Sequence, residues 1–127
     1  MEKEFVPYLL ALELWEIGFD EPCFGYYDHQ IKELDTISSE VCERLCKHNT
    51  HIKAPTFQQV FRWFDYSTDW SGFIVPSKEE GCFDWWIQNY EDPNYLTIES
   101  DDWYRGREEA ELACLEKLIE LVEQKEK

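Results

Sequence analysis

The spacing of apolar residues alternates along this chain between the period of a helix and the period of a strand, and this alternation constrains the fold most. Residues 6–19, 54–67 and 107–127 carry the helical period. Between them, residues 23–34 and 72–90 alternate apolar and polar positions as strands do. This order predicts an α+β fold, a small antiparallel sheet with three helices packed mainly on one face. We expect a single α+β domain over residues 1–127.

The three helical segments have recognisable ends. Pro7 suits the first turn of the first helix, and Gly18 suits a left-handed cap at its end. Pro55 lies near the start of the second helix, and Glu108 and Glu109 complement the dipole of the third. The apolar stripes predicted to be buried are Leu9, Leu10, Ala11, Leu14 and Ile17; Phe57, Val60, Phe61 and Phe64; and Leu112, Leu115, Ile119 and Val122.

Two hairpins are expected between the helices. In residues 23–34 the turn falls near Asp28, and in residues 72–90 it falls within PSKEEG. In the second arm of the later hairpin apolar and polar positions alternate, so one face should pack against helices. The other face carries Trp86 and should be partly exposed. Residues 94–100 are expected to supply one more short strand.

Charge excludes several functions. The chain has 28 acidic and 12 basic residues, a formal net charge of −16. This excess argues against direct binding to a nucleic-acid backbone or to an anionic membrane surface. It is compatible with a basic protein partner, and it also keeps an aromatic-rich chain in solution. The five cysteines show no disulfide framework and no secretory signal is recognisable, so we expect free thiols and a cytoplasmic location.

The stretch CERLCKHNTH holds four side chains that zinc can bind, Cys42, Cys46, His48 and His51. Structural zinc sites usually take ligand pairs from two separate segments, whereas all four residues lie here in one short segment. Residues 38–46 also have an apolar face, on which cysteine would simply be buried. We therefore expect no metal and no cofactor, and a zinc site at these four residues stays open as the alternative.

Catalytic motifs are not recognisable elsewhere. The chain has no serine in a GxSxG elbow, no phosphate-binding glycine loop and no calcium-loop pattern. Because no converging set of catalytic residues can be read, we expect a protein that is not an enzyme, and a metal-dependent enzyme remains a third hypothesis.

Aromatic residues make up 17% of the chain, too many to be central in a small core, so some should lie at the surface. Trp and Arg are enriched at interface hot spots, and aromatic rings stack on nucleotide bases. The segments DDWYRGR and FRWF combine both types, although ordinary packing is the alternative. The residues predicted to bind a partner or ligand are Trp86, Trp103, Tyr104, Arg105, Arg107, Arg62 and Trp63.

Three blocks of the chain, GFDEPCFGYYD, APTFQQVFRWF and EEAELACLEKLIELV, together resemble a family of small uncharacterised proteins from phages and prophages of Bacteroidetes-type bacteria. The resemblance supplies no activity and no catalytic residue. It implies an accessory protein in the cytoplasm of the bacterial host that binds and blocks a host defence protein. The alternative is a sponge that sequesters a small nucleotide-type immune signal, with a ligand pocket at a homo-oligomer interface.

Overall fold

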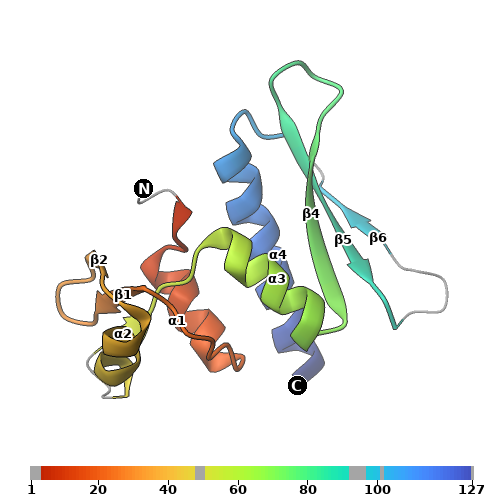
Figure 1. Cartoon of the computed structure of the whole chain (residues 1–127). Coiled ribbons are helices and arrows are strands. Elements are labelled where there is room, and N and C mark those ends of the chain that lie inside the picture. The colour runs from red at the N-terminus through yellow and green to blue at the C-terminus, as the bar shows by residue number, and fades with distance from the viewer. Residues whose placement is uncertain (1–3, 48–50, 92–96, 101, 127) are drawn as a thin grey trace. The chain divides into compact units, whose positions relative to one another are not determined.

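The computed structural model describes all residues except 1–3, 48–50, 92–96, 101 and 127 (Figure 1). The chain divides into two compact units, Met1–Gln59 and Val60–Lys127, here called the N-terminal and C-terminal units. Each unit has its own three-stranded antiparallel sheet. The α+β class is confirmed. The expected single sheet with three helices is corrected to two sheets and four helices in the described part of the chain.

The N-terminal unit contains two helices and three short strands. Its sheet has the order β2-β1-β3, and β1 is antiparallel to both neighbours. Helix α1 packs against β3, and α2 packs against β1 and β3. The additional helix α2 and strand β3 are too short to show a clear period in the sequence. The elements are α1 Tyr8–Glu16, β1 Gly25–Asp28, β2 Leu34–Thr36, α2 Ser39–Cys46 and β3 His51–Lys53.

Helix α1 ends as its sequence predicts. Gly18 has φ 105°, and the amides of Gly18 and Phe19 donate to the carbonyls of Trp15 and Leu14 at 3.1 and 3.0 Å. These two hydrogen bonds satisfy carbonyls that the helix end would leave open. The prediction that Leu9 is buried is wrong, because its side chain is 71% exposed. Leu9 precedes the buried stripe by one residue and points about 100° away from it around the helix.

The contrast between Leu14 and Leu9 gives a matched stability test. Leu14 is fully buried in α1, so Leu14→Ala should lower the free energy of unfolding by about 3 kcal/mol through the cavity it leaves. Leu9→Ala removes the same atoms from an exposed position and should change it by less than about 0.5 kcal/mol. Urea denaturation of both variants measures the difference. Equal losses would contradict the burial of Leu14.

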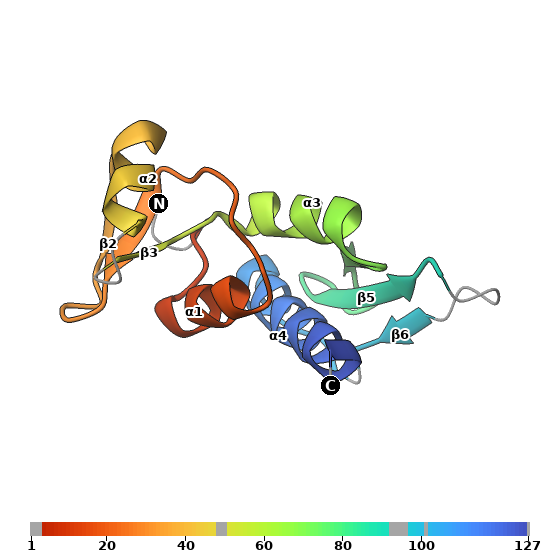
Figure 2. The ribbon, with the colours of Figure 1, turned by 90° about the horizontal axis from the view of Figure 1, so that it is seen from below.

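The C-terminal unit is a three-stranded sheet with helices on one face. The sheet has the order β4-β5-β6, and α4 packs along β4 and β5 (Figures 1 and 2). The predicted hairpin of residues 72–90 and the extra short strand are confirmed. The hairpin predicted within residues 23–34 is present, but its second strand, β2, begins only at Leu34 and so lies later in the chain than expected. Helix α3 begins in the N-terminal unit and continues into this one. The elements are α3 Phe57–Ser67, β4 Trp70–Pro76, β5 Phe83–Asn89, β6 Thr97–Glu99 and α4 Arg107–Glu126.

At Gly72 the helices approach the sheet closely. A Cβ atom there would lie 2.8 Å from Cys114 Sγ, 2.9 Å from Leu118 Cδ1 and 3.2 Å from Phe61 Cε1. The side of β4 on which Gly72 lies is therefore covered by α4 and α3. Phe61 and Leu112 are only half-buried, whereas the most deeply buried large residues of this unit are Val60, Phe64, Ile87, Leu115, Leu118 and Ile119.

Candidate functional site

The face of the C-terminal sheet that points away from α4 carries exposed aromatic side chains. The strand register places Phe73 opposite Trp86, and Trp86 opposite Glu99. Their sequence neighbours Gly72 and Ile87 face the helices, so Phe73 and Trp86 point to the other side. Phe73 is 40% exposed and Trp86 is 41% exposed, which confirms the expected partial exposure of Trp86. We call this surface the open face.

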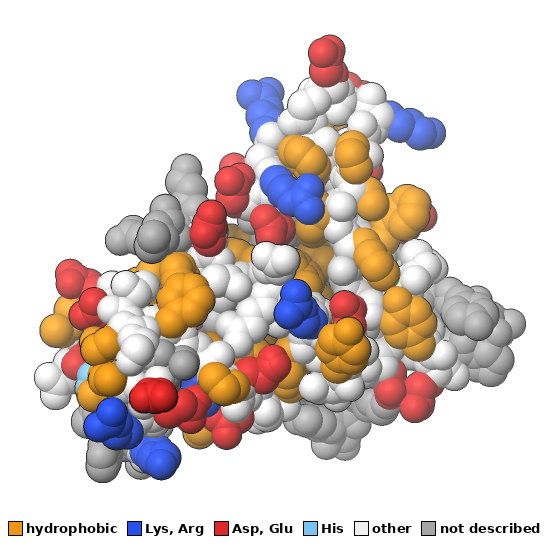
Figure 3. Space-filling view, in the orientation of Figure 1, with side chains coloured by type: hydrophobic (Ala, Val, Ile, Leu, Met, Phe, Trp, Pro, Cys, Tyr) orange, Lys and Arg blue, Asp and Glu red, His pale blue; other side chains and the backbone are white. Residues whose placement is uncertain are grey.

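Trp103 is a further exposed aromatic residue, next to the segment that pairs with β5 beyond the strand β6. Tyr104 exchanges two backbone hydrogen bonds with Phe83, at 2.7 and 2.8 Å, and so pairs with the helix-facing side of β5. Trp103, the residue before Tyr104, lies outside the strands and is 44% exposed. In the space-filling view, hydrophobic side chains gather along the β4–β5 hairpin (Figure 3). The sequence predicted Trp86 and Trp103 as binding residues but missed Phe73.

Acidic side chains accompany these aromatics. The register puts Asp84 opposite Val75 on the open face, and Glu99 lies beside Trp86. Lys and Arg are absent from β4, β5 and β6 within their described bounds. This surface therefore combines an apolar centre with negative charge, which suits a partner that offers apolar side chains flanked by basic ones.

Three further residues that were predicted to bind a partner or ligand follow β6 in the chain, and they differ in exposure and contacts. Arg107 is exposed and stands over the ring of Phe83, with 6.0 Å between its Cζ and the ring centroid. Arg105 is exposed, and Tyr104 is half-buried through its pairing with Phe83. Arg107 therefore covers an aromatic ring of its own chain.

The FRWF segment splits between surface and core. Arg62 is exposed on α3, whereas Trp63 is only 9% exposed and packs edge-to-face on Phe64 with 5.1 Å between ring centroids. Successive helical residues point about 100° apart, which separates the two side chains. Trp63 is therefore part of the core, which corrects its prediction as a binding residue.

The predicted Cys–His stretch lies in the N-terminal unit. Cys42 is fully buried on α2, and its Sγ lies 4.0 Å from Cys46 Sγ. His51 lies on β3 with Nε2 3.6 Å from Asp28 Oδ2, and His48 falls outside the described residues. Among the described side chains no group of three or more His, Cys, Asp or Glu lies close enough to hold a metal ion.

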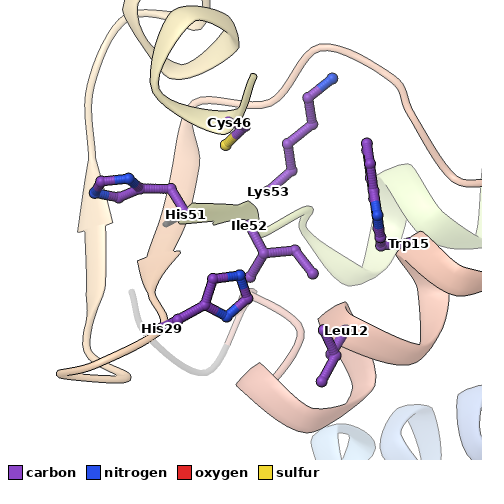
Figure 4. A pocket seen from close by; sticks show the side chains of 7 residues that line it. All are labelled: Leu12, Trp15, His29, Cys46, His51, Ile52 and Lys53. Atoms are coloured by element: carbon purple, nitrogen blue, oxygen red, sulfur yellow. The ribbon is translucent and has the colours of Figure 1, made fainter. Parts of the chain in front are cut away.

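A small pocket of about 130 Å³ lies beside these residues (Figure 4). Lys53 is its most buried charged group, at 4% exposure, and it forms ion pairs with Asp20, at 2.8 Å, and with Glu43. Burial alone would lower the pKa of Lys53, but the hydrogen bonds that Lys53 donates to the carboxylates of Asp20 and Glu43 outweigh it and raise the pKa. The lining residues are Leu12, Trp15, His29, Cys46, His51, Ile52 and Lys53.

The polar groups around this pocket are already engaged by the protein. His29 Nδ1 lies 2.9 Å from the hydroxyl oxygen of Tyr8, and Lys53 is neutralised by two acids. Lys53 was not among the residues predicted from the sequence, although its position between Ile52 and Ala54 in HIKAP is the signal for a lysine drawn into an apolar strand. The arrangement favours a structural ion pair over a binding site.

The thiols of this unit are held in their protonated form. Burial, with the neighbouring thiol of Cys42, raises the pKa of Cys23 and of Cys46 to about 12, and burial also raises the pKa of Cys42 itself. A thiol of high pKa is a poor nucleophile and a poor metal ligand near neutral pH. The cysteines are therefore suited to packing rather than to catalysis.

No protein-family model, no curated protein and no solved structure matches this chain. Of the helices in the described residues, none is long and apolar enough to cross a membrane. The open face is the surface from which a function can be proposed.

Proposed function

We propose that this chain is a small acidic, non-enzymatic protein that binds a partner protein through the open face of its C-terminal unit. The observation that supports the proposal is the exposure of Phe73 and Trp86 on a face opposite α4, with the exposed Trp103 close to the same sheet in the chain. Exposed aromatics that share one face are typical of interaction surfaces, because each buries a large area with few rotatable bonds.

The charge around these aromatics defines the partner further. Asp84 and Glu99 lie on the same face, and the whole chain carries a net charge of −16. A partner with basic residues around an apolar centre would be attracted before contact and held afterwards. In the setting that the resemblance implies, the partner is a host defence protein, and binding blocks it.

The nucleotide-sponge hypothesis has less support. Pockets for ligands of drug size usually measure about 300–1,000 Å³, whereas the pocket in the N-terminal unit measures about 130 Å³. Arg62, Arg105 and Arg107, the residues expected to meet phosphate, do not line it. The hypothesis of a metal-dependent enzyme also lacks support, because the described residues contain no cluster of three or more His, Cys, Asp or Glu side chains that could hold a metal ion.

Trp86→Ala should weaken the complex about thirtyfold, because it removes an aromatic anchor from the centre of the proposed interface. The partner is first captured from host lysate on immobilised protein, then purified and titrated against each variant by calorimetry. Tyr66→Ala is the matched control, since Tyr66 is 85% exposed on α3, away from the open face. Circular dichroism verifies that both variants are folded.

The proposal is wrong if the partner binds Trp86→Ala and Trp103→Ala as tightly as it binds the native chain. Raising the salt concentration should slow association and leave dissociation nearly unchanged, because the charges act mainly before contact. Binding of a nucleotide in the same calorimeter, abolished by Arg105→Ala, would favour the sponge instead.

A further inference from the structure

Strand β4 is an outer strand of the C-terminal sheet, and the ladder to β5 determines which of its backbone groups are free. Tyr90 N donates to Asp69 O, and Ser77 N donates to Cys82 O, both at 2.9 Å, one at each end of the ladder. In an antiparallel ladder, residues whose backbone N–H and C=O groups bond to the neighbouring strand alternate with residues whose backbone groups are directed away from it. The residues of β4 whose backbone groups are directed away from β5 are Trp70, Gly72, Ile74 and Pro76.

Two of these four positions are closed by local features. The hydroxyl of Thr68 accepts a hydrogen bond from the amide of Trp70 at 3.1 Å and lies 3.0 Å from the Trp70 carbonyl oxygen. Pro76 has no N–H group. The N–H and C=O groups of Gly72 and Ile74 remain, and within the described residues no hydrogen bond joins them to another segment. The free edge is therefore a short window between two closed ends.

Natural sheets usually protect such an edge with a charged residue, a bulge or a covering segment. The sequence of β4, WSGFIVP, contains no charged residue, and its seven residues pair with β5 in one unbroken register. Phe73 and Val75 flank the window on the open face, and Ile74 flanks it on the helix side. The edge thus offers backbone donors and acceptors with apolar side chains on both sides.

We propose that this edge receives an extended segment of the partner protein, which adds a strand beside β4 and bonds to the backbone of Gly72 and Ile74. The inference rests on the proposed function, because the added strand would continue the open face beside Phe73. Acidic residues outnumber basic ones, 28 to 12, so a second copy of the chain would be repelled. A segment in which apolar and basic residues alternate would be attracted.

The test uses a synthetic peptide in which valine alternates with lysine. Nuclear magnetic resonance follows the hydrogen exchange of the backbone amides, and titration measures affinity. The amides of Gly72 and Ile74 should exchange quickly in the free protein and slow down when the peptide binds. A fully N-methylated peptide of the same charge cannot donate to the edge, and a glutamate version has the wrong charge, so neither should bind.

Ile74→Pro removes the outward N–H of Ile74 without removing a bond to β5, and Ile74→Ala removes the side chain but keeps that N–H. We expect the valine–lysine peptide to bind Ile74→Pro about tenfold more weakly than Ile74→Ala, because one backbone hydrogen bond is lost and the strand edge is blocked. If the proline variant does not fold, the amide exchange of the native chain and the N-methylated peptide still decide.

Several results would overturn the inference: no binding of the valine–lysine peptide, equal binding of the N-methylated peptide, or slow exchange of Gly72 and Ile74 in the free protein. The natural partner separates this inference from the proposed function. A complex lost in Trp86→Ala but kept in Ile74→Pro refutes the strand addition alone. A complex kept in Trp86→Ala and Trp103→Ala refutes the binding function of the open face.

Discussion

Phe64→Ala is expected to lower the free energy of unfolding by about 3–5 kcal/mol, the largest loss of stability among the substitutions considered. Phe64 is fully buried on α3, and its ring packs edge-to-face on that of Trp63. Alanine would remove the burial of a large ring and leave a cavity that the surrounding helix and sheet can fill only in part. Urea denaturation followed by tryptophan fluorescence measures the loss.

Tyr66→Ala serves as the control for this experiment. Tyr66 lies on the same helix two residues later and is 85% exposed, so its replacement should change the free energy of unfolding by less than about 0.5 kcal/mol. If Phe64→Ala unfolds at the same urea concentration as Tyr66→Ala, the assignment of the buried face of α3 is wrong.

Alkylation of Cys46 by iodoacetamide should be more than about tenfold slower in the native protein than in the unfolded chain near neutral pH. Cys46 is only half-buried and lines the pocket, so contact with the reagent is not fully blocked. Burial and the thiol of Cys42 raise its pKa from 9.0 to about 12, which makes the reactive thiolate much scarcer. The higher nucleophilicity of a more basic thiolate offsets only part of that loss.

Peptide mass spectrometry of protein labelled with and without urea gives the two rates for Cys46. A native rate within about tenfold of the unfolded rate would contradict the protonated state of this thiol. The same shift makes stability depend on pH. Above the unfolded value of 9.0 the unfolded chain releases the proton that the native chain keeps. The stabilising contribution is therefore complete below pH 9.0 and is lost as the pH rises toward about 12.

The sequence predicted best where the period was long or the turn signals were strong. The sequence patterns correctly predicted helices α1, α3 and α4 and the β4–β5 hairpin. Two glycines supplied the turn signals: Gly18, with φ 105°, ends α1, and Gly81, with φ 77°, lies in the hairpin turn. Leu9 was misplaced because a stripe read from sequence is wider than the surface that neighbouring elements cover. Trp63 was chosen because it adjoins Arg62, and residue type alone does not distinguish a buried Trp from an exposed one.

The candidate site could be read only in part. Trp86 was expected at the surface because it alternates with Trp85 and Ile87, and strand alternation is a local property. Phe73 required the strand register, which depends on pairing between two strands and is not encoded in either one alone. The ion pairs of Lys53 with Asp20 and Glu43 join residues far apart in the chain, so no local pattern revealed them.

The sequence by itself determined the α+β class, the three long helices, both hairpins and the acidic character, because periodicity, turn chemistry and charge are properties of neighbouring residues. Only the tertiary structure decided that the strands form two sheets and that the described helices of the C-terminal unit pack on one face of the β4–β5–β6 sheet. It also decided that, within the described residues, the backbone groups of Gly72 and Ile74 bond to no other segment. Those features depend on which elements pair and on which side helices pack, and contacts between distant segments select among arrangements that the local pattern permits equally.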